Sequence, residues 1–164
     1  MITRVFIHGL ESTSQGTKGL FFRQKYPDMI IEDYTGPLEE RMDQLNARLS
    51  GGTNLILVGS SYGGLMAALY TCRNTEHVRK LILLAPALHL KAFVNCHDLH
   101  LDVPVHLYHG SRDNVVPADE VRLIASKIFT HLDYQLVNDD HSLHRTFPWI
   151  PWDKLLEASQ CHSV

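Results

Sequence analysis

The sequence predicts a doubly wound α/β domain around a parallel sheet, because short apolar runs alternate with helix-like stretches over its 164 residues. The runs are nearly continuous in Val, Ile, Leu and aromatic residues, which is typical of strands covered on both faces. Such alternation favours right-handed crossovers and a mostly parallel, six-stranded sheet with helices on both faces. The expected strands are residues 4–7, 29–32, 55–58, 81–84, 105–108 and 134–137.

Two of the intervening stretches have the apolar period of an amphipathic helix. Pro37 suits the first turn of the earlier stretch, and Gly51 and Gly52 suit its exit. Asp119 and Glu120 begin the later stretch, where the positive end of a helix favours acidic side chains. The apolar positions are Leu38, Met42, Leu45 and Leu49 in the first stretch and Val121, Ile124, Ala125 and Ile128 in the second.

Length predicts one domain over residues 1–164. The net charge is -3, and the sequence has no basic stripe. Neither nucleic acid nor an anionic membrane is therefore an expected partner. No apolar run is long enough to span a bilayer, and the N-terminus lacks the apolar region of a secretory signal. The three cysteines, Cys72, Cys96 and Cys161, cannot all pair in one chain, which favours free thiols and a cytoplasmic location. Nothing in the sequence indicates the oligomeric state.

The most informative motif is Gly59-Ser60-Ser61-Tyr62-Gly63, which lies between a predicted strand and a predicted helix. This is the G-x-S-x-G pattern of a nucleophile elbow in the context that gives the pattern meaning. Gly59 and Gly63 flank Ser61 because a Cβ at either position would collide with neighbouring backbone. We therefore interpret Ser61 as a catalytic nucleophile. Its neighbour Ser60 is less suitable, because a motif centred on Ser60 would have Val58 in place of the first glycine.

A serine nucleophile needs a histidine base and an acid that orients the base. Asp113 lies in the loop after the fifth predicted strand, and His141 lies in the loop after the sixth. The carboxyl ends of parallel strands meet at one edge, so these side chains and Ser61 are expected to converge. His144 is the rival base. We interpret the two carboxylates before His141, at positions 139 and 140, as loop residues.

The tetrahedral intermediate of acyl transfer requires backbone N–H donors that point at its oxyanion. The N–H of Tyr62, directly after the predicted nucleophile, is one expected donor. The second is expected from the loop after the first strand, where His8-Gly9 allows a close approach, and we assign it to Leu10.

Four segments in this order resemble the α/β-hydrolase superfamily, and most closely its compact, cap-less bacterial esterase-like members. The segments are F-I-H-G-L at 6–10, G-S-S-Y-G-G at 59–64, H-G-S-R-D-N-V-V-P at 109–117 and D-D-H-S-L at 139–143. The resemblance implies a single-domain α/β-hydrolase fold and a Ser61–Asp113–His141 hydrolase that forms an acyl-enzyme. Its expected substrate is a small carboxylic ester or thioester, and the reaction is expected to need no cofactor or metal.

Two departures from larger members shape the expected substrate. Segment 86–103, where a lid is often inserted, has room only for a short helix, which favours short or soluble acyl groups and no cap domain. Only one glycine follows His8, which argues against the H-G-G-G loop of lipases. Trp149 and Trp152, in the Pro-rich segment after the predicted base, are candidate substrate-pocket residues.

Three other functional readings stay open at this point. A binding or signalling protein could use the same scaffold without catalysis, because fold does not fix function. The same triad could also hydrolyse another bond, such as a carbon–carbon bond. A metal site at His97-x-x-His100 or at His106 and His109 is weakly supported, since no further ligand motif accompanies these residues.

Overall fold

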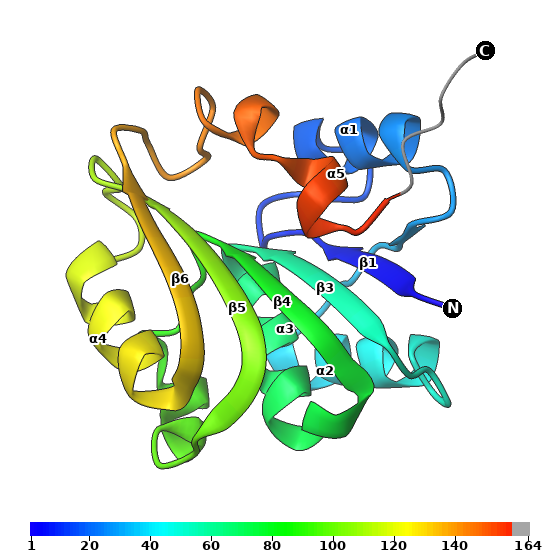
Figure 1. Cartoon of the computed structure of the whole chain (residues 1–164), viewed down its shortest axis with the longest axis horizontal. Coiled ribbons are helices and arrows are strands. Elements are labelled where there is room, and N and C mark those ends of the chain that lie inside the picture. Colours follow the sequence, from blue (N-terminus) through cyan, green and yellow to red (C-terminus); the bar gives the residue numbers. More distant parts are fainter. Residues whose placement is uncertain (159–164) are drawn as a thin grey trace.

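The computed structural model describes residues 1–158, which form one six-stranded sheet in the order β2-β1-β3-β4-β5-β6 (Figure 1). All five strand pairings are parallel, as the apolar runs predict. The second strand is much shorter than expected, with two residues. The strands are β1 (Thr3–Ile7), β2 (Ile30–Ile31), β3 (Leu55–Ser60), β4 (Val78–Leu84), β5 (Leu101–Gly110) and β6 (Phe129–Val137).

Helices cover both faces of the sheet, as expected (Figure 1). One face carries α2 (Leu38–Arg48), α3 (Tyr62–Arg73) and α4 (Ala118–Ile128), and the other carries α1 (Thr17–Lys25) and α5 (Trp152–Leu155). Pro37 is the extended residue that precedes α2 and not part of its first turn. Three short 3-10 helices complete the described elements: η1 (Thr75–His77), η2 (Lys91–Cys96) and η3 (Phe147–Trp149).

Successive residues of the inner strands enter two separate cores. On β3, Leu55 and Leu57 pack toward α2 and α3, whereas Ile56 and Val58 pack toward α1 and α5. This division explains the continuous apolar runs, because a strand between two helical layers needs apolar side chains on both faces. The Phe22 and Trp152 rings meet edge to face in the smaller core, with ring centroids 4.8 Å apart.

The expectation that all strands are covered on both faces is wrong for β5 and β6. Along β5, buried positions alternate with more exposed ones, and β6 has only one fully buried residue, Phe129. The buried strand residues of the core under α1 and α5 extend only as far as β4, and Tyr108 and Val137 pack against it only in part. The rest of this face of β5 and β6 carries polar side chains such as His106 and Asp133. The sequence signal was present as a period-2 alternation in β5.

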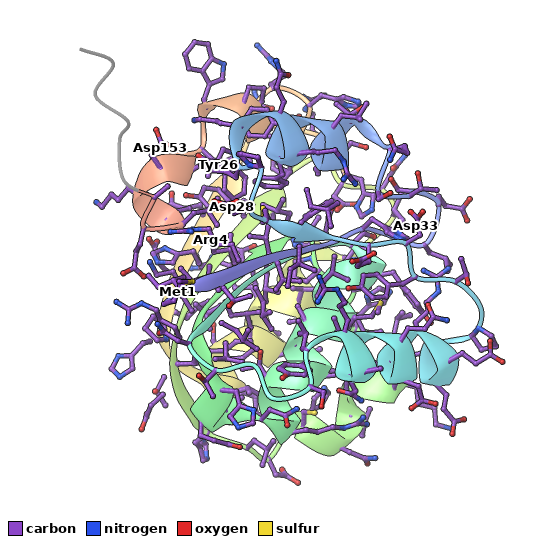
Figure 2. All side chains as sticks on the ribbon, turned by 90° about the vertical axis from the view of Figure 1, so that its right-hand side faces the viewer. Met1, Arg4, Tyr26, Asp28, Asp33 and Asp153 are labelled. Atoms are coloured by element: carbon purple, nitrogen blue, oxygen red, sulfur yellow. The ribbon has the colours of Figure 1, made fainter. Side chains whose placement is uncertain are left out.

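The α5 segment is held against β1 and α1 by polar contacts (Figure 2). Arg4 on β1 donates to the carbonyls of Leu156 and Glu157 at 2.7 and 2.8 Å, and the Tyr26 hydroxyl donates to Asp153 at 2.5 Å. These bonds hold α1, β1 and α5 together, which places the loop before α5 beside the carboxyl ends of the strands.

The cysteines and the helix lengths can be compared with what the composition predicts, within the described part of the chain. Cys72 and Cys96 are free thiols, and burial raises the pKa of the Cys72 thiol. Cys161 lies outside the described residues. None of the helices within residues 1–158 is long and apolar enough to cross a bilayer.

Candidate active site

Ser61 occupies the sharp turn between β3 and α3 and is held there by its backbone. Its φ of 55° is unusual for a non-glycine residue and marks a strained turn. Its N–H donates to the Leu84 carbonyl at 2.9 Å, and its carbonyl accepts from Gly64 and Ala87, both at 3.0 Å. The strain is therefore maintained by bonds to β4 and to the segment that follows β4.

The two flanking glycines are required by close backbone contacts. A Cβ on Gly63 would lie 2.6 Å from the carbonyl carbon of Ile7, and one on Gly59 would lie 2.7 Å from the Cα of Gly64. Neither neighbour is a flexible side chain that could move aside. This confirms the steric reason that the sequence gives for glycine at these positions.

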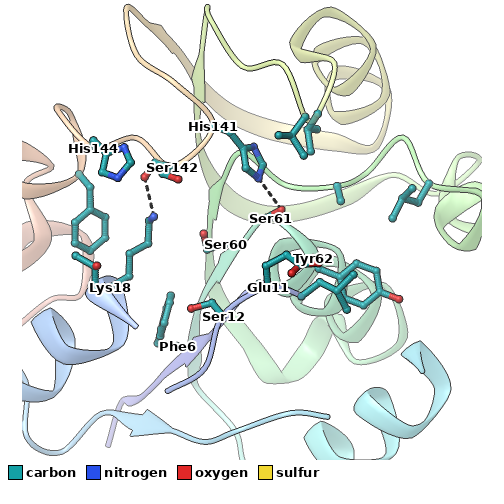
Figure 3. A pocket seen from close by; sticks show the side chains of 18 of the residues that line it. Phe6, Glu11, Ser12, Lys18, Ser60, Ser61, Tyr62, His141, Ser142 and His144 are labelled. Atoms are coloured by element: carbon teal, nitrogen blue, oxygen red, sulfur yellow. Dashed lines mark hydrogen bonds between the residues drawn. The ribbon is translucent and has the colours of Figure 1, made fainter. Parts of the chain in front are cut away.

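The structure brings Ser61, His141 and Asp113 together in one hydrogen-bonded series. His141 Nε2 lies 2.9 Å from Ser61 Oγ, and His141 Nδ1 lies 2.7 Å from Asp113 Oδ2 (Figure 3). A carboxylate can only accept, so Nδ1 carries the proton and Nε2 is free to accept from the serine hydroxyl. The rival base His144 is instead exposed, with Nδ1 2.7 Å from Asp140.

The side chain of Asp113 is fully buried, and both of its carboxylate oxygens form hydrogen bonds. The amides of Val115 and Val116 donate to Oδ1, each at 2.8 Å, while Oδ2 faces His141. Burial opposes ionisation, but the bonds from His141, Val116 and Val115 outweigh it and hold the pKa of the Asp113 carboxyl below its ordinary value. Asp113 is therefore a fixed anion behind the imidazole.

A second histidine, which the sequence analysis weighed only as a metal ligand, also contacts this carboxylate. His109 Nε2 lies 3.0 Å from Asp113 Oδ2 and 3.2 Å from the Val116 carbonyl. Both partners accept, so Nε2 carries the proton, and the buried Nδ1 has no hydrogen-bond partner. Burial lowers the pKa of His109, which keeps the ring neutral. No motif in the sequence indicated this contact.

Asp139, interpreted above as a loop residue, organises the loop that carries His141. It is 1% exposed, and its carboxylate accepts from the amides of Asp140, Arg145 and Thr146 at 2.8, 3.0 and 2.7 Å. Burial opposes its ionisation, but the bonds from Thr146 and Asp140 keep the pKa of Asp139 below its usual range. Asp139 is thus a structural anion of the base loop.

The two residues whose amides are expected to bind an oxyanion, Leu10 and Tyr62, line the same cavity as Ser61. Tyr62 is the first residue of α3, where an N–H has no partner within the helix. His8 fixes the other loop, because its Nδ1 donates to the Gly9 carbonyl at 2.7 Å and its Nε2 accepts from the Tyr34 amide at 2.9 Å. Within residues 1–158, the structure records no acceptor for the amide of Leu10 or Tyr62.

A cavity of about 640 Å³ opens over Ser61 and His141. Leu10 and Tyr62 contribute to one part of its wall, together with Leu90 and Val116. Polar residues after β1 also line the cavity, among them Glu11, Ser12 and Lys18 (Figure 3). A small molecule of ordinary size fits such a space.

The prediction that Trp149 and Trp152 line the pocket is wrong. Trp152 is 1% exposed because its indole packs against α1, and its Nε1 donates to the Phe147 carbonyl at 2.9 Å. Trp149 is 86% exposed and lies outside the cavity wall. The neighbouring Phe147 and Pro148 line the cavity instead. The short helix η3 sets which aromatic side chain faces inward, and composition alone does not encode that direction.

The histidines weighed as metal ligands are not gathered into a binding site. Across residues 1–158, no three His, Cys, Asp or Glu side chains come together in a way that could hold a metal ion.

Comparisons with known proteins agree with this architecture. A profile of the family described as alpha/beta hydrolase fold matches residues 11–99, which is more than half of the chain. The chain therefore belongs to the α/β-hydrolase family. It has the compact form of the members whose motifs its four segments resemble. A search of curated proteins gave no match.

Many solved structures share the fold. A predicted CIB-like hydrolase from Thermoplasma acidophilum has a TM-score of 0.72 and 22% identity, over 94% of this chain and 86% of that one. Mouse alpha/beta hydrolase domain-containing protein 10 has a TM-score of 0.72 and 21% identity, over 86% and 82%. A monoacylglycerol lipase from Paleococcus ferrophilus has a TM-score of 0.70 and 13% identity, over 95% and 94%. Identities this low show the shared fold alone.

Proposed function

We propose that the protein is a serine hydrolase that cleaves small carboxylic esters or thioesters through an acyl-enzyme. The observation that supports it best is the continuous series from Ser61 Oγ through His141 to Asp113, at 2.9 and 2.7 Å. A binding module has no need for a serine, an imidazole and a buried carboxylate in this geometry.

In the first half of the reaction, Ser61 Oγ attacks the substrate carbonyl carbon while His141 Nε2 takes the hydroxyl proton. The carbonyl oxygen becomes an oxyanion, which the amides of Leu10 and Tyr62 bind. The intermediate collapses, the alcohol or thiol leaves with the proton from His141, and the acyl group stays on Ser61. Water then attacks the acyl-enzyme, with His141 as base, and releases the carboxylic acid and free Ser61.

Asp113 would act by orienting His141 and by stabilising the imidazolium that forms in each half-reaction. Its four hydrogen-bond contacts, two from backbone amides and two from imidazoles, favour the ionised form throughout. The proposed mechanism needs no cofactor.

The expected substrates are short or soluble acyl esters. The segment between β4 and β5 contains only the short helix η2, so no separate layer covers the cavity there. The fold neighbour named as a monoacylglycerol lipase gives indirect support for ester chemistry on this scaffold. Faster turnover of long-chain than of short-chain p-nitrophenyl esters would contradict the preference.

The decisive test is intact mass after treatment with a fluorophosphonate probe, which reacts only with an activated serine. Wild type should gain one adduct rapidly, and Ser61→Ala and His141→Gln should gain none. Ser60→Ala is the matched control and should still be labelled. A folded wild-type protein that takes up no probe would refute the proposal and favour a binding function.

A further inference from the structure

A lysine forms part of the cavity wall, close to the loop that carries the proposed base. Lys18 is the second residue of α1, and its Nζ donates to the Ser142 carbonyl at 2.7 Å. Its ammonium also lies 5.5 Å from the centre of the Phe147 ring. In Figure 3 the Lys18 side chain runs along the wall toward Ser142, with Ser60 and Ser61 between it and Tyr62.

This ammonium has no counter-ion in the described part of the chain. No carboxylate of residues 1–158 lies within 4.0 Å of Nζ, and the Ser142 carbonyl is its one recorded hydrogen-bond acceptor. An ammonium carries three donors, so two remain for other partners. Glu11 also lines the cavity but forms no ion pair with Lys18.

The two carboxylates whose fields act on Lys18 are engaged elsewhere. Asp139 accepts from three backbone amides of its own loop, and Asp140 accepts from His144 Nδ1 at 2.7 Å. Burial lowers the pKa of Lys18, and the fields of Asp140 and Asp139 offset this effect only in part. A half-buried cation that lacks a direct partner loses hydration without full compensation.

We propose that Lys18 is a specificity residue that binds a carboxylate of the substrate, so that the preferred esters or thioesters are anionic. The inference rests on the proposed hydrolase function and narrows its substrate class. A carboxylate in the cavity would supply the missing counter-ion and accept the free Nζ donors. The ring of Phe147 and the Ser142 carbonyl would hold the ammonium in place before the substrate arrives.

The competing explanation is that Lys18 only tethers the base loop through Ser142. A tether would help neutral and anionic substrates equally, because it acts through the position of His141. An anion site would help only substrates that carry the charge. The two explanations therefore differ in substrate selectivity and not in overall rate.

The test compares kcat/KM for matched esters with wild type and Lys18→Met. Mono(p-nitrophenyl) adipate and p-nitrophenyl hexanoate differ by a carboxylate at the acyl end. m-Carboxyphenyl hexanoate and phenyl hexanoate differ by a carboxylate on the leaving group. For at least one pair, wild type should prefer the anionic ester, and Lys18→Met should lower that preference about 10- to 100-fold, the usual range for a charge-assisted contact. The affected pair shows which side of the ester faces Lys18.

Three controls complete the design. Lys25→Met removes a cation from the same helix outside the cavity and should leave the preference unchanged. Lys18→Arg keeps the charge and should retain most of the preference. The wild-type preference should also shrink as salt concentration rises, which remains measurable if Lys18→Met fails to fold.

Two outcomes would overturn the inference. An equal loss of kcat/KM for charged and neutral esters in Lys18→Met would show that Lys18 is a tether. A wild-type preference for the neutral ester in both pairs would also contradict the inference. If wild type hydrolyses none of the four esters and takes up no fluorophosphonate, the proposed function fails together with the inference.

Discussion

The two halves of the sheet hold their parts of the candidate site by different means. On the inner half, Ser61 is fixed by backbone contacts between β3, α3 and β1, where Gly59 and Gly63 leave no space for a side chain. On the outer half, Asp113 and His141 extend from loops after β5 and β6 and are fixed by side-chain hydrogen bonds. The inner strands are covered on both faces, whereas β5 and β6 are open on one.

This difference shows how each half tolerates change. Steric fixation fails when one methyl group is added, because protein interiors have no spare volume. Fixation by hydrogen bonds is shared among several donors, as at Asp113 and Asp139, so the loss of one donor leaves others in place. We therefore expect substitutions on the inner half to have larger effects than comparable substitutions on the outer half.

The largest effect is expected for Gly63→Ala. The added Cβ would collide with the carbonyl groups of Ile7 and His8, which belong to the central sheet and the candidate oxyanion loop. We expect a loss of at least about 3 kcal/mol in the free energy of unfolding and a fall of 100-fold or more in fluorophosphonate labelling rate. Denaturant unfolding and timed mass spectrometry measure the two effects.

Gly51→Ala is the control for this substitution. Gly51 has a φ of 75° but no heavy atom within 4 Å of an added Cβ, so only backbone strain of about 1 kcal/mol is expected. Equal destabilisation by the two alanines would show that the elbow is not held by sterics.

The next largest effect is expected for Ile82→Ala, which we compare with Asp133→Ala at a position aligned with it across the sheet. Ile82 on β4 is in register with His106 on β5 and Asp133 on β6, and their side chains share a face. Ile82 is fully buried under α1 and α5, whereas the Asp133 side chain is 52% exposed. Ile82→Ala should cost about 3 kcal/mol in denaturant unfolding, and Asp133→Ala about 0.5 kcal/mol or less. A large cost at Asp133 would mean that the outer face is covered in solution.

The sequence predicted the inner half better than the outer half for a physical reason. Continuous apolar runs and the spacing of Gly59, Ser61 and Gly63 are local signals, and they gave the parallel sheet and the strand–turn–helix around Ser61. On the outer half, the direction of a side chain depends on how the irregular loops after β5 and β6 fold. The contact of His109 with Asp113, four residues away, and the role of Asp139 in its own loop were therefore not visible in the sequence.

The same limit explains the failure at the tryptophans. Pro148 and Pro151 identified the segment as irregular, but which aromatic ring faces the cavity depends on how the chain turns between them. Packing against α1 drew Trp152 into the core and left Phe147 at the cavity. Direction in an irregular segment follows from tertiary contacts, which periodicity does not report.

After Gly63→Ala and Ile82→Ala, a smaller effect is expected at His109, whose pKa is lowered by burial and only partly restored by Asp113. An unfolded histidine binds a proton near its ordinary pKa of about 6.5, whereas folded His109 binds one only at lower pH. Between the folded and the unfolded pKa of this histidine, the unfolded state therefore binds more protons than the folded state. As a result, His109 makes the free energy of unfolding fall as the pH decreases from 7 toward 5. Few carboxylates titrate in this window, which isolates the histidine contribution.

His109→Gln keeps an amide donor near Asp113 but cannot titrate. We expect it to cost about 1 kcal/mol at pH 8 and to reduce the loss of melting temperature between pH 7 and 5 relative to wild type. His131→Gln, which removes an exposed histidine from β6, should leave that pH dependence unchanged. If His109→Gln retains the full acid sensitivity of wild type, His109 is not the neutral buried histidine that makes stability fall toward acid pH.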